Sequence, residues 1–286
     1  MRPTFPQELH LTPDYLLIGN VTQDITPSGL VMGGTATYSA ITAHRLGWRV
    51  GVVTHVGPDL DVAAKLPGMS VHAVPSTCTT TYENVYHGTA RTQWVRAVAD
   101  PLTLNDVPPD WRQARIVHLG PLTQEFEPEL ARAFPHALVG ATPQGWLRAW
   151  DAHGQVSYKP LARPGERLRG IHALVFSPED VAYDSAAMLE LVQAVPLAVI
   201  TQAHEGAVVY APDRPRSLPA RPAWVVDPTG AGDVFAAAFF IRLAETNDPL
   251  EAAAFANVVA SFSIEGLGAT AIPGREQVES WLRRER

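Results

Sequence analysis

The stretch "DPTGAGDVFAAAF", residues 227–239, passes from a glycine-rich half into an apolar, alanine-rich half. The second half has the alanine content and apolar spacing of a buried helix. The preceding "AWVV", residues 223–226, predicts a strand. Gly230, Ala231 and Gly232 are therefore expected where a strand leads into a helix N-terminus.

A helix N-terminus built from small residues is a candidate anion site. Its first N–H groups lack helical partners, its dipole is positive there, and glycine lets a phosphate approach the backbone. Asp233 follows in the first turn, where the same dipole is expected to keep its carboxylate ionised. Such a pair suits phosphoryl transfer to an alcohol, with the carboxylate accepting the hydroxyl proton. The pattern also fits a structural helix with Asp233 near its N-cap, so the loop alone does not decide.

The composition favours a protein that acts on small molecules. A chain of 286 residues with 46% hydrophobic residues suits one large globular domain, and its net charge of −7 argues against nucleic acids and anionic membranes. No Gly-Lys pair occurs, which excludes a Walker A loop. Cys78 is the only cysteine, and prolines and acidic residues interrupt the N-terminus, so we expect neither a disulfide nor a secretion signal. A cytoplasmic protein is the resulting expectation.

Apolar runs alternate with helical patterns along the chain. Residues 15–19 and 49–57 read as buried strands on either side of a helix at residues 33–48. Further strands are expected at residues 114–120, 137–142, 173–177 and 197–201. Apolar strands that alternate with helices indicate a parallel sheet covered on both faces, which is an α/β fold.

Two segments interrupt this alternation. Residues 79–100 are rich in threonine and aromatic residues, with His87-Gly88 at the place of a hairpin turn, and residues 24–34 form a second extended piece. Together they predict a small separate sheet, a lid over the mouth of the main one. No long linker divides the chain, so we expect a single domain over residues 1–286.

The opening stretch resembles the C-terminal signature D-T-x-G-A-G-D-x-F of the ribokinase-like (phosphofructokinase B, or pfkB) carbohydrate kinases. Other stretches resemble landmarks of that family and follow in the family's order: "GNVTQD" (19–24), "GGTATYSA" (33–40), "VTHVGPD" (53–59), "ITQAHEGAVVY" (200–210) and "AAAFANVVASFSIEGLGATAIP" (252–273). The resemblance covers about residues 15 to 273. It favours the kinase interpretation over the structural one.

The resemblance implies a fold, an activity and a set of site residues. The fold would be a three-layer α/β/α sandwich with a mostly parallel sheet and a small β-sheet lid. The activity would be ATP-dependent transfer of the γ-phosphate to a sugar or cyclitol hydroxyl, with Mg²⁺ on the nucleotide and a monovalent cation as an optional further requirement. The implied roles are Asp233 as general base, Gly230, Ala231 and Gly232 as anion hole, Asp24, Gly33 and Gly34 as substrate-binding residues, and Thr201, Gly206 and Asn257 along the ATP cleft.

Three positions depart from the family's pattern. The family often has N-x-x-E where this chain has "SPED", so Ser177 and Asp180 stand there, and Asp180 would hold the metal through water. Ala203 replaces the usual glycine of the nucleotide turn. Tyr38 stands where ribokinases carry a sugar-binding asparagine, which argues against ribose as the acceptor.

The segment "VGATPQGWLRAWDAHGQV" (139–156) resembles the plant myo-inositol kinases, as does "RTQWVRAVAD" (91–100). This resemblance makes Gln144 and Arg91 candidates for polyol contacts, with Arg148 behind them. Ordinary solvated arginines are the alternative interpretation of Arg91 and Arg148. We therefore hypothesise that the acceptor is myo-inositol or a related cyclic polyol.

Several alternatives stay open. The chain could be a nucleoside or ketohexose kinase of the same family, a non-catalytic sugar- or nucleotide-binding regulator, or an ATP-independent phosphotransferase or phosphatase. An exposed lid sheet could pair with a second copy into a homodimer or close over its own site.

Overall fold

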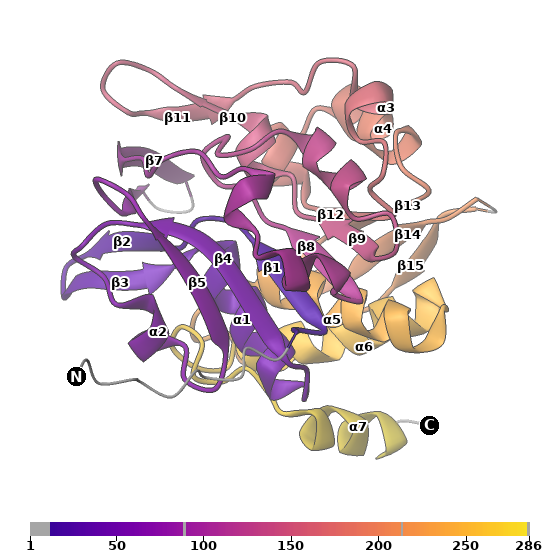
Figure 1. The fold of residues 1–286 in the computed structure, drawn as a ribbon. Helices are drawn as coiled ribbons and strands as arrows, with labels where there is room; N and C mark the ends of the chain where they lie inside the picture. Colours follow the sequence, from indigo (N-terminus) through magenta and orange to yellow (C-terminus); the bar gives the residue numbers. More distant parts are fainter. Residues whose placement is uncertain (1–11, 88–89, 213, 285–286) are drawn as a thin grey trace.

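The main sheet has nine strands in the described part of the chain, which in this computed structural model comprises residues 12–87, 90–212 and 214–284. Their order is β15-β14-β13-β12-β9-β8-β1-β4-β5 (Figure 1). The strands are β1 (Tyr15–Ile18), β4 (Val50–Val56), β5 (Ser70–Pro75), β8 (Ile116–Leu119), β9 (Leu138–Ala141), β12 (Ala173–Phe176), β13 (Leu197–Thr201), β14 (Ala207–Tyr210) and β15 (Arg216–Leu218). Pairing is parallel from β13 to β5, and β14 and β15 add an antiparallel edge.

Helices cover both faces of this sheet. Tyr15 and Leu17 of β1 belong to one core cluster, which also contains residues of α1, α5 and α6. Leu16 and Ile18 point to the opposite face and join a second cluster. The helices are α1 (Gly34–Arg45), α2 (Val62–Lys65), α3 (Pro164–Arg167), α4 (Ser185–Gln193), α5 (Ala231–Thr246), α6 (Pro249–Ser263) and α7 (Arg275–Arg284), with 3-10 turns η1 (Leu104–Asp106), η2 (Pro109–Gln113), η3 (Pro128–Ala133), η4 (Gln144–Leu147), η5 (Pro178–Val181) and η6 (Ala203–Glu205). The predicted three-layer α/β architecture is therefore confirmed.

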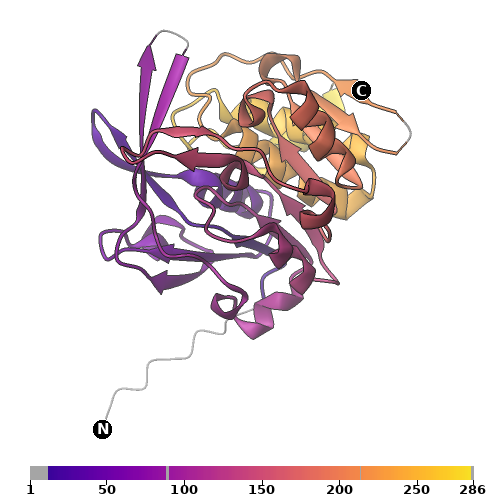
Figure 2. The same cartoon turned by 90° about the horizontal axis from the view of Figure 1, so that it is seen from above.

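A second sheet, called the small sheet below, comes from the two segments that interrupt the alternation. Its strands are β2 (Thr22–Thr26), β3 (Gly29–Gly33), β6 (Thr80–His87) and β7 (Ala90–Ala97), in the order β3-β2-β6-β7. Figure 2 shows the β6–β7 hairpin standing out from the body of the molecule. This confirms the predicted separate sheet, while the turn expected at His87-Gly88 lies partly outside the described residues. A short antiparallel pair, β10 (Arg148–Trp150) and β11 (Val156–Tyr158), lies beside β7.

The strand predicted at residues 223–226 is wrong. These residues form an extended loop, and the side chain of Trp224 is 82% exposed. The antiparallel edge of the main sheet is occupied instead by β15, so this segment has neither a strand partner nor an apolar surface to cover it. Two of its backbone N–H groups have partners after α6: Val226 N donates to Ile264 O at 2.8 Å, and Trp224 N donates to Glu265 Oε1 at 3.4 Å.

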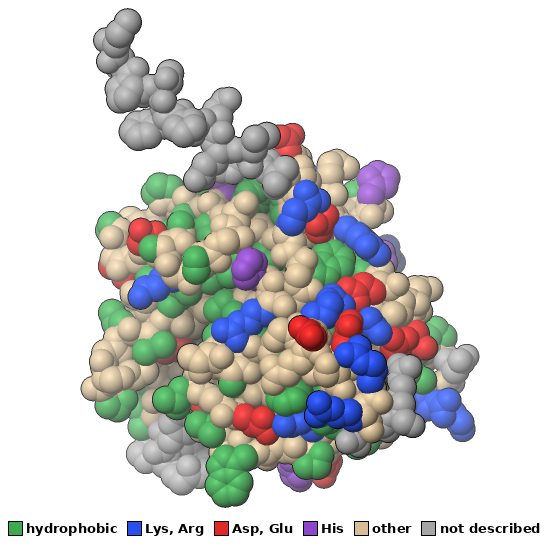
Figure 3. Space-filling view, turned by 90° about the horizontal axis from the view of Figure 1, so that it is seen from below, with side chains coloured by type: hydrophobic (Ala, Val, Ile, Leu, Met, Phe, Trp, Pro, Cys, Tyr) green, Lys and Arg blue, Asp and Glu red, His purple; other side chains and the backbone are tan. Residues whose placement is uncertain are grey.

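Charged side chains of both signs lie next to one another on the face seen in Figure 3. Several such pairs link helices, including Arg242 with Glu251 at 2.5 Å and Arg275 with Glu245 at 2.6 Å. Within the described residues, none of the helices combines the length and apolar character that crossing a bilayer requires.

Candidate active site

The N-terminus of α5 has glycines for two different physical reasons. Gly230, its N-cap, has a left-handed backbone (φ 77°), and an added Cβ atom would lie 2.4 Å from the ring of Tyr38. Gly232 is exposed, and a Cβ atom there would meet no described atom within 4 Å. The space beside the first-turn N–H groups is therefore open to an anion.

Asp227 fixes the loop that leads into α5. Its Oδ1 accepts a hydrogen bond from Thr229 N at 2.9 Å, and its Oδ2 accepts one from Gly268 N at 2.9 Å. Burial raises the pKa of Asp227, but the hydrogen bonds from Thr229 and Gly268 outweigh it and lower the pKa overall. This ionised side chain holds the glycine-rich loop against the loop that follows α6.

Asp233 is a partly buried carboxylate at the same helix end. Thr35 Oγ1 donates a hydrogen bond to Asp233 Oδ1 at 2.7 Å. Burial raises the pKa of Asp233 to about 6, the Thr35 hydrogen bond lowers it, Asp180 raises it, and Arg148 lowers it. Burial is thus the largest effect on this carboxyl, which is still mostly ionised at neutral pH. A carboxyl with a pKa near neutrality suits a general base.

A second helix N-terminus, that of α1, meets the first. Gly33 is its N-cap, and a Cβ atom there would lie 2.3 Å from Asp24 Oδ2. Gly34 has φ 83°, and its Cβ atom would lie 2.8 Å from Leu122. Asp24 lies within β2 of the small sheet, opposite Val31, and not at the end of β1, which stops at Ile18. The structure therefore brings Asp24, Gly33 and Gly34 together, as the resemblance implies.

Tyr38 of α1 connects the two helix ends. Its side chain packs against Gly230, and burial raises its pKa. The negative charges of Asp227, Asp24 and Asp233 raise it further. The charges of three carboxylates, including those of the predicted acceptor residue Asp24 and the predicted base Asp233, therefore act on the same phenol.

The structure describes the predicted polyol-binding residues to different extents. Gln144 is partly buried and opens η4, directly after β9. The backbone of Arg91 lies in β7 opposite Tyr86, but its side chain lies outside the described part of the chain. Arg148 is not an ordinary solvated arginine, because its guanidinium lies 5.8 Å from the centre of the Tyr82 ring and its charge acts on Asp233.

Asp180 lies in η5, and its negative charge raises the pKa of Asp233. Its Oδ2 accepts hydrogen bonds from Ser177 N at 2.7 Å and from Ser177 Oγ at 2.9 Å, which closes a capping box. Within the described residues, no group of three or more His, Cys, Asp or Glu side chains forms a metal cluster. A Mg²⁺ ion carried by a nucleotide needs only one or two protein carboxylates, so Asp180 fits that more limited task.

Two of the three predicted nucleotide-binding residues, Gly206 and Asn257, lie around one segment of chain, Leu218–Ala220. Gly206 has φ 99°, and a Cβ atom there would lie 2.1 Å from Leu218 O. The buried Asn257 donates through Nδ2 to Leu218 O at 3.0 Å and to Pro219 O at 3.1 Å. Thr201 ends β13, and its hydroxyl donates to Phe176 O at 3.4 Å. Both amide hydrogens of Asn257 are thus occupied by the backbone, which makes it a support of this segment.

Sequence reasoning missed two contributors to the site. Thr35 donates to Asp233 from 198 positions away in the chain, and its hydroxyl in "GGTATYSA" was the available signal. The electrostatic effect of Arg148, which lowers the pKa of Asp233, was also missed. No sequence signal connects a residue of β10 with a helix that begins more than eighty positions later.

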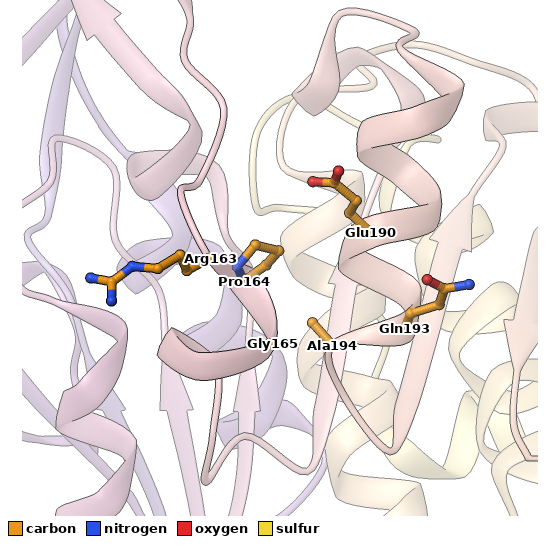
Figure 4. Close-up of a pocket in the computed structure, with 6 residues that line it drawn as sticks. All are labelled: Arg163, Pro164, Gly165, Glu190, Gln193 and Ala194. Atoms are coloured by element: carbon orange, nitrogen blue, oxygen red, sulfur yellow. The ribbon is translucent and has the colours of Figure 1, made fainter.

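A surface hollow between α3 and α4 lies apart from these residues (Figure 4). Its lining residues are Arg163, Pro164, Gly165, Glu190, Gln193 and Ala194. None of the predicted site residues lines it, and the side chain of Arg163 extends away from Glu190 in Figure 4. This hollow is therefore not the site described above.

The layered sheet and the two facing helix ends define a ribokinase-like fold. Residues 169–275 match the model of the pfkB family of carbohydrate kinases. The cytidine kinase of Thermococcus kodakarensis is 28% identical over 255 residues, which cover 79% of this chain and 87% of that protein. The ribokinase of Bacillus subtilis is 27% identical, with 88% of each chain covered.

A solved structure has the same fold. A pyrophosphate-dependent myo-inositol-1 kinase, converted into a myo-inositol-3 kinase by substitution, superimposes with a TM-score of 0.78 at 21% identity, covering 95% of this chain and 99% of that one. The resemblance to the ribokinase-like, or pfkB, family of carbohydrate kinases is therefore confirmed. These similarities support a kinase, and its acceptor and donor are considered next.

Proposed function

We propose that the protein is an ATP-dependent kinase that phosphorylates a hydroxyl group of a cyclitol or sugar, with Asp233 as the general base. One observation carries the proposal. The Asp233 carboxyl, with a pKa raised to about 6, stands beside the open space over Gly232 at the α5 N-terminus. A proton acceptor and an anion site at one point are the two requirements for phosphoryl transfer to an alcohol.

The reaction follows from these groups. Asp233 accepts the proton of the acceptor hydroxyl, whose oxygen forms a bond to the γ-phosphorus. The bond between that phosphorus and the β–γ bridging oxygen breaks, and ADP leaves with the electron pair. The N–H groups of the first turn of α5 stabilise the negative charge on the transferred phosphoryl oxygens. Gly230, Ala231 and Gly232 form this anion hole.

ATP is the proposed donor, held along the segment supported by Gly206 and Asn257 and beside Thr201. The exposed apolar side chains of Trp224 (82%) and Leu267 (71%), on loops joined to the α5 N-terminus, support a donor that carries a base. Bound Mg²⁺ would neutralise phosphate charge, and Asp180 would hold it through water. Pyrophosphate is the alternative donor, since a kinase with the same fold uses it.

The proposed acceptor is myo-inositol or a related cyclic polyol. The Asp24 carboxylate can accept hydrogen bonds from two neighbouring hydroxyls, next to the tightly packed Gly33 and Gly34. Gln144 and Arg91 would contact the rest of the polyol rim. Nucleosides are the main competitors, since a relative at 28% identity is a cytidine kinase.

A product-based screen tests the proposal. Purified protein is incubated with ATP or with pyrophosphate and with cyclitols, ribose, fructose or cytidine, and phosphorylated products are measured by mass spectrometry. The matched control is Asp233→Asn. We expect phosphorylated inositol with ATP and none with the control. No phosphorylated product with any donor would refute the kinase assignment, and tenfold more efficient use of cytidine or fructose would refute the acceptor.

Two further proposals concern the oligomeric state of the protein and its location in the cell. The edge strand β3 and its neighbour carry the exposed apolar side chains Ile25, Leu30 and Val31, which could pair two small sheets in a homodimer. Light scattering of the wild type and of Leu30→Lys tests this, because the variant should be monomeric. A cytoplasmic location remains the proposal made from the cysteine content.

A further inference from the structure

Two hydroxyl groups of α1 donate hydrogen bonds to one residue of α5. Thr35 Oγ1 donates to the carboxylate oxygen Asp233 Oδ1 at 2.7 Å, and Ser39 Oγ donates to the carbonyl oxygen Asp233 O at 3.0 Å. Thr35 and Ser39 lie four positions apart, so they occupy one face of the helix, and both are fully buried. Helix α1 therefore fixes both the side chain and the backbone of this aspartate.

Glycines at the ends of two neighbouring strands let Thr35 approach the main sheet. Gly120 follows β8, and a Cβ atom there would lie 2.6 Å from the methyl carbon of Thr35. Gly19 follows β1, and its Cβ atom would lie 2.5 Å from Gly120 O. The methyl group of Thr35 thus packs against backbone, which leaves this β-branched side chain little freedom to rotate. Packing therefore keeps the Thr35 hydroxyl directed at Asp233.

The two carboxylate oxygens of Asp233 are consequently not equivalent. Oδ1 accepts the Thr35 hydroxyl, whereas Oδ2 accepts no hydrogen bond from the described part of the chain and stays accessible to solvent. Asp227 provides the contrast, because the backbone N–H groups of Thr229 and Gly268 occupy both of its oxygens. Of these two carboxylates, that of Asp233 is the one with an oxygen available to accept a proton.

We propose that Thr35 is a positioning residue for proton transfer: it holds Oδ1 of Asp233, so that the proton of the acceptor hydroxyl is taken up at Oδ2. This rests on the proposed function, in which Asp233 is the general base. The acceptor O–H bond breaks, its electron pair stays on the oxygen that attacks phosphorus, and the new O–H bond forms at Oδ2. Thr35 keeps its own proton and touches neither the acceptor nor the donor.

Three variants test this role: Thr35→Val, Thr35→Ser and the matched control Thr42→Val. Thr42 is a fully buried residue of the same helix, and its hydroxyl donates to Tyr38 O at 2.7 Å. Thr35→Val keeps the shape but lacks the donor, so kcat should fall at least about tenfold while the KM values for acceptor and ATP change less than threefold. Thr35→Ser retains the donor and should recover most of kcat, and Thr42→Val should keep full activity.

The pH profile gives a readout that a merely structural role would not move. The charged and titratable groups around Asp233 are Asp180 of η5, Arg148 of β10, Tyr15 of β1 and Tyr38 of α1. The Thr35 hydrogen bond lowers the pKa of Asp233, so its loss should raise that pKa and move the acidic limb of kcat to higher pH. The kcat deficit of Thr35→Val should therefore be at least about twofold greater at pH 6 than at pH 8. The profile of Thr42→Val should match that of the wild type.

A measurement without substrates separates this inference from the proposed function. The pKa of Asp233 is read by NMR from isotope-labelled aspartate carboxyl groups, and the Asp233 signal is identified by its loss in Asp233→Asn. Thr35→Val should raise this pKa, and Thr42→Val should leave it in place. An unchanged pKa of Asp233 in Thr35→Val, or an unchanged kcat of that variant, would overturn the inference even if the protein is a kinase. If the pKa rises but the wild type phosphorylates none of the screened acceptors, the proposed function and the proton transfer at Oδ2 both fail, and only the contact between Thr35 and Asp233 stands.

Discussion

The two helix N-termini that meet at the site contain glycines that differ in what surrounds them. At the start of α1, the Cβ positions of Gly33 and Gly34 are blocked by Asp24 and Leu122. At the start of α5, Gly232 faces open space. Both sequences look alike as glycine-rich helix starts. Protein atoms fill the space beside the glycines of α1, whereas the space beside Gly232 is open, and there we propose that an anion binds.

This difference assigns separate tasks to the two ends. The α1 end positions a carboxylate, Asp24, by packing backbone directly against it. The α5 end leaves its N–H groups accessible and places Asp233 beside them. Thr35 of α1 joins the two ends through its hydrogen bond to Asp233. Substitutions at the α5 end should therefore lower turnover, and those at the α1 end should lower stability or acceptor binding.

Asp233→Asn should have the largest effect on turnover. Loss of the proton acceptor should lower kcat at least ~100-fold and leave ATP affinity nearly unchanged. The same variant should melt at a higher temperature, because a carboxylate with a pKa of about 6 destabilises the fold at neutral pH by up to about 3 kcal/mol. Steady-state kinetics and calorimetry check both effects, and retention of more than a tenth of kcat would contradict the assignment.

Gly232→Val and Gly33→Ala test the two ends directly. The valine at position 232 would enter the open space, so we expect turnover to fall about 100-fold with an unchanged melting curve. The alanine at position 33 would collide with Asp24, so we expect about 1–3 kcal/mol of destabilisation. Circular-dichroism melts and kcat separate the outcomes. Normal activity of Gly232→Val would show that no phosphate docks at this helix end.

Asp24→Ala should affect the acceptor and spare the donor. Substrate hydroxyls left without a partner cost about 1–3 kcal/mol each, which corresponds to a roughly 10- to 100-fold loss of kcat/KM for the acceptor. The KM for ATP should change little. A variant with unaltered acceptor kinetics would remove Asp24 from the binding site and leave the α5 end as the only functional one.

The acidity of Asp233 predicts a pH dependence. Its carboxyl must be ionised to accept a proton, so kcat should rise with pH through about 6 and level off above 7. At pH 5 the activity should be about tenfold below the plateau. A profile of kcat from pH 4.5 to 8.5 at constant ionic strength measures this. If kcat shows no decrease down to pH 4.5, as expected for a midpoint near pH 4, burial does not raise the pKa of Asp233.

Ala203→Gly should have the smallest effect. Ala203 has φ 50°, a left-handed conformation in the turn where the family's usual residue is glycine. Glycine would relieve strain of about 1 kcal/mol and lose a similar amount through the greater freedom of the unfolded chain. The melting temperature should therefore shift by only a few degrees at most, and kcat should stay within twofold. A large loss of ATP affinity would give the Ala203 side chain a direct role.

Much of the fold could be predicted because its signals are local. The apolar run at residues 15–19 becomes β1, buried on both faces, and the alanine-rich stretch after Gly232 becomes α5. The strand predicted at residues 223–226 is wrong because an apolar, β-branched run becomes a strand only where another strand pairs with it, and none of the described strands does so here. Arg91 lies in the predicted hairpin, but what its side chain contacts stays a prediction.

The sequence by itself determined the backbone at the α5 N-terminus and the presence of Asp233 there, because Gly230's left-handed conformation and a helix start depend on near neighbours. Only the tertiary structure decided the chemistry of that carboxyl. Burial raises its pKa, and its partners Thr35 and Arg148 come from 198 and 85 positions away in the chain. Desolvation and long-range charge depend on which elements pack together, and packing is a property of the whole fold.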